Sequence, residues 1–404
     1  MRGGILGVHN IVNTKSNNQK ARTSVVVVIS DSGVYGASVL CRGGLTVPLV
    51  STVVYEQVPF QNEFSYEYFY TMLRMSLHRI LSKLELETKG VLPDTVEVIL
   101  SAPWSISEVH TIDYKKKQAF TFSQQLAMNL VESDFRESIK NLDDVVGREE
   151  GHHGLIEHFT MHVLLNGYFT YEPVGKQAKE VEITTLLSYT DPGFLLGIRK
   201  HVERFFPETP YEIRSMARTH MIAWRSLFPY LSDYLIVDVR GEVTELILVG
   251  RNSIDGVYSF PVGFHTIKRM LMHRLVRSAG EVDALLRVHM RSQNHEHVHI
   301  LVQKGLEAGS RLWLNALRKV LQEMGSSRLL PKDIFLLAPV LVRDELYRVL
   351  RAELFSEYIP THAVPIIQKI ERSHGLGLVQ YNTSTHRNFD IDTAILGDVA
   401  KANK

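Results

Sequence analysis

The chain has 404 residues, a formal net charge of +1 and a single cysteine, Cys41. This length allows about two to three domains, and the balanced charge gives no electrostatic reason to expect nucleic-acid binding. A lone cysteine excludes an internal disulfide and is typical of a reducing compartment. No apolar run reaches the ~18 residues that a membrane-spanning helix needs. We therefore expect a cytoplasmic protein without a direct transmembrane span.

The first part of the chain predicts an α/β unit that opens with strands. Residues 1–22 lack the apolar core of a secretory signal and are expected to form a flexible N-terminal tail. The β-branched run Ser24–Ile29 indicates a buried central strand, which Tyr35–Cys41 and Leu49–Glu56 follow as further strands. Residues 64–84 carry apolar side chains at helical spacing. Three strands followed by a helix are typical of an α/β domain.

The middle of the chain alternates strands and helices. Pro93 marks a boundary, after which Thr95–Ala102 predicts a strand and residues 121–140 predict a helix with a Ser or Thr cap. The charged stretch Asn141–His158 is expected to be an exposed loop. Three more strands and a helix with an Asp-Pro start are then predicted over Phe159–Leu165, Tyr168–Glu172, Glu180–Tyr189 and Pro192–Phe205.

Residues 233–268 contain the most informative pattern of the sequence. A buried strand, Tyr234–Val239, leads into a tight turn at Gly241 and then into a second strand, Thr244–Val249. The much earlier segment 24–40, SVVVVISDSGVYGASVL, has the same strand–turn–strand order. Two such turns that face a shared cleft would clamp a triphosphate between their backbone N–H groups.

The last part of the chain predicts helices and one further strand. A basic helix begins near His265, and a second helix covers Lys304–Glu323. Lys332–Ala338 indicates a strand, and Asp344–Leu354 indicates a helix. Residues 386–404 have few apolar positions and no basic face, so we expect a C-terminal tail there that does not anchor the protein to a membrane.

The order of these elements resembles the actin-like ATPases of the FtsA and PilM type, which are bacterial proteins of cell division and of type IV pilus assembly. The resemblance covers about residues 23–385 and rests on the two hairpins and on the stretch DIFLLAPV, residues 333–340. It implies a two-lobed actin-like fold of the α/β class, related to ribonuclease H. It also implies an extra α+β subdomain inserted in the first lobe.

The resemblance sets the expected domain limits. They are an N-terminal tail at 1–22, the first part of lobe one at 23–92, the inserted subdomain at 93–178, the second part of lobe one at 179–230, lobe two at 231–385 and a C-terminal tail at 386–404.

The resemblance also implies which residues would contact ATP and Mg²⁺. These residues are Asp31, Ser32, Gly33, Asp238, Arg240, Gly241, Thr244 and Gly263. No catalytic residue and no protein ligand of a metal is assigned.

Several positions depart from the family pattern of glycines and carboxylates. The replacing residues are Val28 and Ser30 in the first hairpin, Arg240, Glu242 and Glu245 in the second, and Ala338, Pro339 and Val340 in the third motif. A non-glycine residue in left-handed geometry costs about 1–2 kcal/mol. Glu242 would also bring a like charge close to the phosphates, whereas Arg240 is a candidate phosphate partner. We therefore expect ATP and Mg²⁺ binding to be weak or lost.

Together with these departures, the resemblance implies a scaffold or adaptor at the cytoplasmic face of the bacterial inner membrane, acting in pilus assembly or cell division. The partner implied by the resemblance is a cytoplasmic segment of a pilus inner-membrane protein or the tubulin-like division protein. A homo-oligomer or filament of the chain itself is a further implied assembly. The alternative that stays open is an active ATP-binding ATPase, or a sugar-kinase-like enzyme of the same superfold.

Two other signals suggest binding sites. The run His295–His299, HEHVH, has alternating histidines that would share one face of a strand and bind zinc. A solvated loop is the favoured interpretation, because no cysteine or aspartate cluster completes the site nearby. The basic helix His265–Arg277 would suit an anionic lipid or an acidic partner, but a solvated helix face is the simpler explanation.

Overall fold

The computed structural model describes most of the chain, with gaps between the segments. The described residues are 21–41, 47–88, 90–146, 154–251, 253–291, 297–325, 330–353, 358–359, 364–370, 379–382 and 389–402. Apart from its last two positions, the predicted N-terminal tail at 1–22 lies outside the described residues.

The first lobe is built on a six-stranded sheet with the order β15-β3-β2-β1-β4-β9. The central strand β1 is antiparallel to β2 and parallel to β4, and it is buried throughout Ser24–Ile29, as its continuous β-branched run predicts. The bounds are β1 Arg22–Ile29, β2 Gly33–Cys41, β3 Leu49–Gln57, β4 Thr95–Leu100, β9 Tyr211–Ser215 and β15 Gln380–Tyr381.

The second lobe repeats this arrangement in a five-stranded sheet with the order β12-β11-β10-β13-β14. Here β10 takes the place of β1, because it is antiparallel to β11 and parallel to β13. The duplication that the sequence suggests is confirmed, since each lobe joins a three-stranded antiparallel meander to two parallel strands. The bounds are β10 Tyr234–Val239, β11 Thr244–Val249, β12 Ile254–Phe260, β13 Asp333–Leu337 and β14 Ile366–Lys369.

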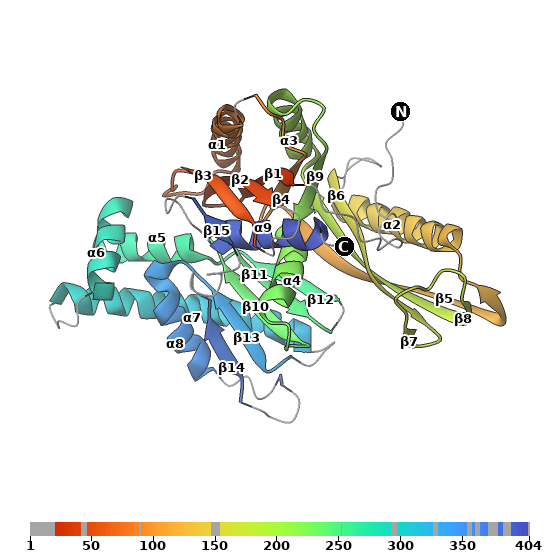
Figure 1. Cartoon of the computed structure of the whole chain (residues 1–404). Coiled ribbons are helices and arrows are strands. Elements are labelled where there is room, and N and C mark those ends of the chain that lie inside the picture. Colours follow the sequence, from red (N-terminus) through yellow and green to blue (C-terminus); the bar gives the residue numbers. More distant parts are fainter. Residues whose placement is uncertain are drawn as a thin grey trace.

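A smaller subdomain projects from the two lobes at the right of Figure 1. It consists of a four-stranded sheet, order β5-β8-β6-β7, with one helix packed on it. The elements are β5 Ile106–Thr121, α2 Gln124–Val146, β6 Gly154–Leu165, β7 Tyr168–Phe169 and β8 Gln177–Thr190. The limits expected for the inserted subdomain, residues 93 and 178, therefore differ from the limits of its sheet. At the first end, β4 pairs with β1 in lobe one, and at the second end, β8 pairs with β5 and β6 of the subdomain.

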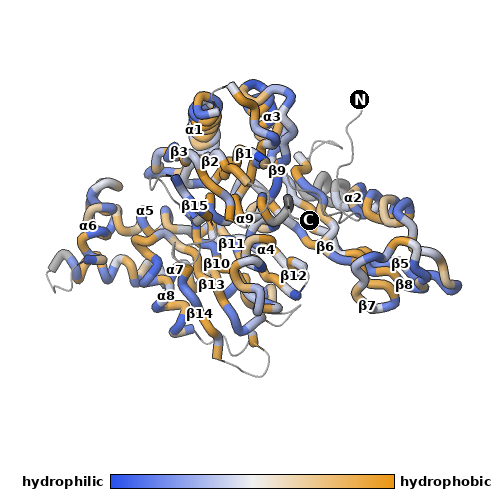
Figure 2. Tube along the Cα trace, viewed as in Figure 1, coloured by the Kyte–Doolittle hydropathy of each residue, from blue (hydrophilic) through white to orange (hydrophobic). Residues whose placement is uncertain are grey.

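Helices cover both faces of the first sheet and connect it to the second. On the outer face lie α1 Tyr66–Glu87 and α3 Pro192–Phe205, which share one hydrophobic core with β1 and β4. Between the two sheets lies α4 Met216–Leu227, whose Trp224 is 0% exposed and packs with Phe335 of β13. Figure 2 shows hydrophobic residues along the central strands of both sheets.

The remaining helices belong mainly to the second lobe. They are α5 Phe264–Leu275, α6 Ala279–Arg291, α7 His297–Gly325 and α8 Val340–Ala352. Residues of all four helices form one core on the outer face of the five-stranded sheet. The predicted strand at Lys332–Ala338 corresponds to β13, and Pro339 stands at the N-cap of α8.

Two sequence-based expectations are wrong at the level of secondary structure. The predicted C-terminal tail contains helix α9, Phe389–Ala402, which packs on the first sheet and on α4, because Ile391, Ala394 and Ile395 are spaced to share one buried helix face. The predicted loop at Asn141–His158 is the end of α2 and the start of β6; its residues 147–153 lie outside the described part. Charge is not a sign of exposure here, because Glu157 is buried and accepts a hydrogen bond from Ser188.

Candidate functional site

The turns of the two equivalent hairpins meet between the lobes. The β1–β2 turn closes with a hydrogen bond from Ser30 N to Gly33 O, and the β10–β11 turn closes in the same way from Arg240 N to Val243 O. A Cβ atom at Gly33 would lie 2.5 Å from the Glu56 carbonyl oxygen, so the first turn requires glycine for close approach to β3.

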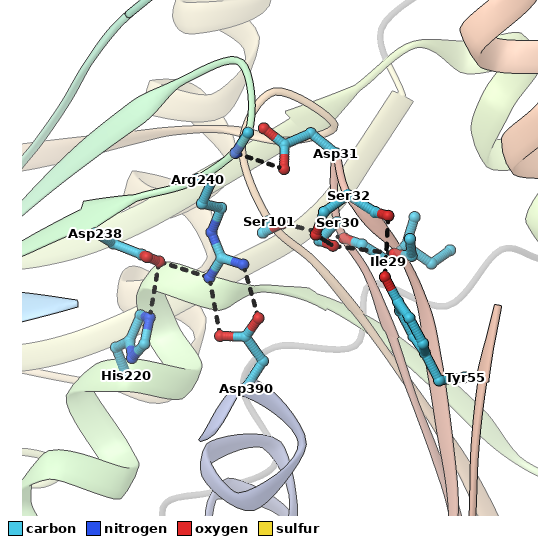
Figure 3. A network of polar contacts seen from close by, with 12 residues as sticks. Ile29, Ser30, Asp31, Ser32, Tyr55, Ser101, His220, Asp238, Arg240 and Asp390 are labelled. Atoms are coloured by element: carbon cyan, nitrogen blue, oxygen red, sulfur yellow. Dashed lines mark hydrogen bonds and ion pairs between the residues drawn. The ribbon is translucent and has the colours of Figure 1, made fainter. Parts of the chain in front are cut away.

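The carboxylate of Asp31, a residue of the first turn, is hydrogen-bonded to the backbone of the second turn. Its Oδ1 accepts a hydrogen bond from Gly241 N at 3.1 Å, and its Oδ2 accepts one from Glu242 N at 2.6 Å. The side chain points from lobe one into the hairpin of lobe two (Figure 3). A carboxylate that accepts two backbone N–H groups uses the same donors that such a turn offers to a phosphate oxygen.

Burial and hydrogen bonding act on Asp31 in opposite directions. Burial raises the pKa of the Asp31 carboxyl above its ordinary value, while the N–H groups of Glu242 and Gly241 and the charge of Arg240 act to lower it. The residue is 1% exposed. This balance means that the contact depends on the two hairpin donors and on the nearby guanidinium, because an isolated carboxylate at this depth would not stay charged.

Arg240 forms ion pairs that connect the second hairpin to the C-terminal helix. Its guanidinium lies 2.5 Å from Asp238 in β10 and 3.0 Å from Asp390 at the start of α9. Asp238 also contacts His220 of α4 at 3.4 Å (Figure 3). Burial alone would lower the pKa of Arg240, but the carboxylates of Asp238, Asp390 and Asp31 raise it above the ordinary value. Arg240 is therefore fully charged and neutralised within the protein.

Glu242 turns away from the hairpin and binds basic side chains of α5. Its carboxylate accepts hydrogen bonds from Arg269 at 3.1 and 2.5 Å and lies 3.0 Å from His265 Nδ1. Burial would raise the pKa of Glu242, but His265 and Arg269 lower it to about 2. The charge that the sequence places beside the expected phosphate site is thus compensated by α5.

Glu245 is the least compensated acid near the cleft. It stands opposite Asp238 on the neighbouring strand and is 3% exposed, and its Oε2 has no hydrogen-bond partner among the described residues. Burial, together with the nearby Asp238, raises the pKa of Glu245 to about 8. At neutral pH this side chain is therefore mainly uncharged, because protonation avoids a second buried negative charge.

The start of α5 is held against the second turn. Phe264 N donates to Arg240 O at 2.8 Å, and His265 N donates to Gly241 O at 2.7 Å. A Cβ atom at Gly263 would lie 2.4 Å from Gly241 O, so only glycine allows this approach of two backbones. The N–H groups of a helix start, which would otherwise favour an anion, are therefore used for backbone contacts.

Comparison with solved structures shows similarity of fold at low sequence identity. The chain matches one in a structure titled "PilM-PilN type IV pilus biogenesis complex" with a TM-score of 0.58, 13% identity and coverage of 94% of this chain and 98% of that chain. The chain has the actin-like ATPase fold. No protein-family profile and no curated protein matches the sequence.

Two further solved structures match at lower TM-scores. One is a protein of unknown function with an actin-like ATPase fold from Bacteroides thetaiotaomicron, with a TM-score of 0.39, 11% identity and coverage of 93% and 95% of the two chains. The other is the cytoplasmic domain of EpsL, an inner membrane component of the type II secretion system of Vibrio cholerae, with a TM-score of 0.35, 8% identity and coverage of 93% and 94%. The match with a TM-score of 0.58 confirms the two-lobed actin-like fold expected from the sequence.

The actin-like fold brings most of the predicted site residues together. Asp31 contacts Gly241, Arg240 contacts Asp238, and Gly263 packs under the second turn. Ser32 and Gly33 remain in the first turn, where Ser32 Oγ lies 3.1 Å from Ser30 Oγ. Thr244 is directed elsewhere, because its hydroxyl donates to Val262 O and accepts from Trp313 Nε1. Their predicted contact with ATP stays a prediction.

Several residues of the actin-like cleft were not found by sequence reasoning. The sequence predicts a tail at Asp390. It also predicts a solvated basic helix at His265 and Arg269, which are the partners of Glu242. A signal for the latter existed, since His265 and Arg269 are four positions apart and lie on one face of α5. No sequence pattern places Asp390 beside Arg240, because α9 returns from lobe two to lobe one.

In this arrangement, the groups that would donate hydrogen bonds to a triphosphate are already used within the protein, so the site does not fit a triphosphate. The two N–H groups of the second turn donate to Asp31, and Arg240 is enclosed by carboxylates. At the third motif, Pro339 supplies no N–H.

Among the described residues, no group of three or more His, Cys, Asp or Glu side chains is placed to hold a metal ion. In that part of the chain, no helix is long and apolar enough to cross a membrane.

Proposed function

We propose that this protein is an actin-like scaffold or adaptor that binds partner proteins at the cytoplasmic face of the bacterial inner membrane, with ATP binding and hydrolysis weak or lost. The observation that carries the proposal is the Asp31 carboxylate in the second turn, 3.1 Å from Gly241 N and 2.6 Å from Glu242 N. A phosphate would have to displace this buried carboxylate before it could use the same donors. In this proposal, the role of the fold is to present surfaces that bind partner proteins.

The ion pairs around Arg240 support this proposal. In a nucleotide site, an arginine beside the turn would offer its N–H groups to phosphate oxygens. Here the guanidinium is buried between Asp238 and Asp390, and the second of these anchors α9 to the hairpin. An added triphosphate would lie close to these carboxylates and to Asp31, a repulsive arrangement of like charges without a bound cation.

Type IV pilus assembly and cell division are the two processes proposed for this scaffold. The structural match names PilM and PilN as a complex, so the first partner class to test is a cytoplasmic segment of an inner-membrane pilus protein. The second is the tubulin-like division protein, and a filament of the chain itself is a third assembly. We place the protein in the cytoplasm and peripherally at the inner membrane.

The competing function is an active ATPase or a sugar-kinase-like enzyme of the same fold. It is favoured by one observation: two equivalent hairpin turns face each other between two duplicated sheets. In that case Asp31 would leave the second turn when nucleotide enters, and phosphate release would exceed the background rate.

Binding experiments with the purified full chain separate these functions. The scaffold proposal predicts saturable binding to one of two probes, the cytoplasmic peptide of a pilus inner-membrane protein or the purified tubulin-like protein, in the absence of nucleotide. Sedimentation without added partner tests the filament. Binding of neither probe and no sedimentation, together with phosphate release from Mg-ATP, would overturn the scaffold proposal in favour of the enzyme.

A further inference from the structure

Two histidine rings face each other where helices α6 and α7 meet. His289 lies in the last turn of α6, and His299 lies in the first turn of α7. Their Nδ1 atoms are 3.4 Å apart, while the ring centroids are 5.6 Å apart with an interplanar angle of 27°, so the rings approach each other by their nitrogen edges. Both residues are partly buried, so an ion from solution can reach them. The cleft between the lobes does not involve these residues.

The separation of the two nitrogens suits a shared metal ion. Zinc binds imidazole nitrogen at about 2.0–2.1 Å with tetrahedral geometry, which places two ligand nitrogens about 3.3 Å apart. The observed 3.4 Å matches this value. Without a metal, the same distance allows a hydrogen bond from one Nδ1–H to the other Nδ1, and metal binding would displace that proton.

The opposite nitrogen of His289 is held by a fixed acceptor. His289 Nε2 lies 3.1 Å from Gln303 Oε1, and the amide nitrogen of Gln303 donates to Glu307 at 3.1 Å. Gln303 also donates a hydrogen bond to Glu345. Two carboxylates therefore fix the amide nitrogen on their side and leave its oxygen to accept from His289 Nε2–H.

This hydrogen-bond chain determines the tautomer of His289. With the proton on Nε2, the neutral ring presents a lone pair at Nδ1, which faces His299. Metal-binding histidines generally donate their other N–H to an oxygen in this manner, and that contact orients the ring. The distance and the tautomer inferred from the Gln303 contact point to the same ligand.

We propose that His289 and His299 form a two-histidine site for a divalent transition metal of the Zn²⁺ class. Solvent completes the coordination, since no third His, Cys, Asp or Glu joins these two among the described residues. Imidazole ligands suit Zn²⁺, Ni²⁺ and Cu²⁺ and exclude Mg²⁺ and Ca²⁺, which require oxygen. The metal ties the end of α6 to the start of α7 and leaves positions open for an outside ligand. This site is independent of the proposed scaffold function.

Zinc titration of the full chain without a histidine tag tests the site. Binding is measured by competition with a fluorescent zinc chelator for the wild type and for His289→Ala, His299→Ala and Gln303→Ala. Loss of either histidine is expected to weaken the tightest Zn²⁺ site at least about tenfold, and loss of Gln303 to weaken it about 10- to 100-fold. His273→Ala, an exposed histidine of α5, is the matched control and is expected to leave affinity unchanged.

Two further outcomes decide the proposal. In the Cu²⁺-loaded wild type, electron paramagnetic resonance is expected to show coupling to two imidazole nitrogens, and His289→Ala is expected to remove one of them. Retention of full Zn²⁺ affinity in His289→Ala would overturn the proposal and leave the binding to histidines outside the pair, such as His295 or His297. Equal loss in His273→Ala would show unspecific binding and would overturn it as well.

Discussion

The carboxylate of Asp31 accepts a hydrogen bond from the backbone N–H of Glu242 at 2.6 Å, although the two residues are 211 positions apart in the chain. The contact joins the first hairpin to the second across the cleft. The carboxylate has two oxygens in one plane, and both are used, because Gly241 donates to the other one at 3.1 Å. A group of the chain itself therefore occupies the donors that the actin-like fold makes available to a phosphate.

Replacing Asp31 by alanine will free the two hairpin N–H groups. The free energy of unfolding is expected to fall by about 1–3 kcal/mol, because two hydrogen bonds to a buried charge are lost. Inorganic phosphate at millimolar concentration is then expected to raise the melting temperature of the variant by filling the vacated donors.

The control for this variant is Asp113→Ala, which removes an exposed carboxylate in β5. Neither this control nor the wild type should respond to phosphate. A wild type that is stabilised as much as Asp31→Ala would show that Asp31 does not block the turn.

Replacing Arg240 by methionine will leave Asp238 and Asp390 without their shared cation. Breaking a buried ion pair from one side costs about 3–5 kcal/mol, and urea unfolding measures this loss. Adding Asp390→Asn to the variant should restore part of the stability, since one uncompensated charge is removed. Arg136→Met, which breaks an exposed pair on α2, should change stability by less than about 1 kcal/mol. Equal effects of the two single substitutions would contradict the assigned role of Arg240.

Replacing Glu245 by glutamine will change how stability depends on pH. Burial raises the pKa of Glu245 from its ordinary 4.5 to about 8 in the folded protein. Between these values the folded protein retains a proton that the unfolded chain has released, so the free energy of unfolding falls as pH rises. Glutamine removes this contribution, so the stability of the variant relative to the wild type should rise with pH to a plateau on the order of 5 kcal/mol.

Urea unfolding at intervals between about pH 4.5 and pH 8 measures this difference. The two proteins should have similar stability at the acidic end and should diverge steadily toward the alkaline end. A difference that is constant over the whole range would show that Glu245 does not titrate in this window.

Replacing Ile395 by alanine tests whether the C-terminal helix is part of the folded lobe. Ile395 is 0% exposed and packs with residues of the first sheet. The cavity is expected to cost about 2–4 kcal/mol of unfolding free energy. Leu86→Ala, at a side chain that is 74% exposed on α1, should change stability by less than about 0.5 kcal/mol. If Ile395→Ala were as mild as this control, α9 would not contribute to the core.

The sequence predicts the duplicated lobes well because the signal is local. Each central strand is a run of buried residues that are mainly β-branched or aliphatic, as at Ser24–Ile29 and Tyr234–Val239, and each is followed by a tight turn. Such a pattern needs only the periodicity of the strand and the chemistry of the turn. The limits expected for the inserted subdomain differ from those of its sheet, since Pro93 marks the loop before β4, which belongs to the first sheet.

The contacts of the cleft are not predictable from the sequence in the same way. Asp31 belongs to a turn whose residues suit contact with a ligand, and nothing local shows that its partner is the turn of the other lobe. Charge predicts exposure for Asp390 and Glu157, but each forms an ion pair with an arginine that is distant in the chain. Pairing over such separations depends on the packing of the lobes, which a single sequence does not reveal.

Isothermal titration of the wild-type chain with Mg-ATP tests the central claim most directly. The hairpin donors are held by Asp31, and the guanidinium of Arg240 is enclosed by Asp238 and Asp390. We therefore predict no saturable binding up to millimolar ATP and no phosphate release above background. Saturable binding of Mg-ATP to the wild type at micromolar concentration would contradict a cleft that is closed by the protein's own charges.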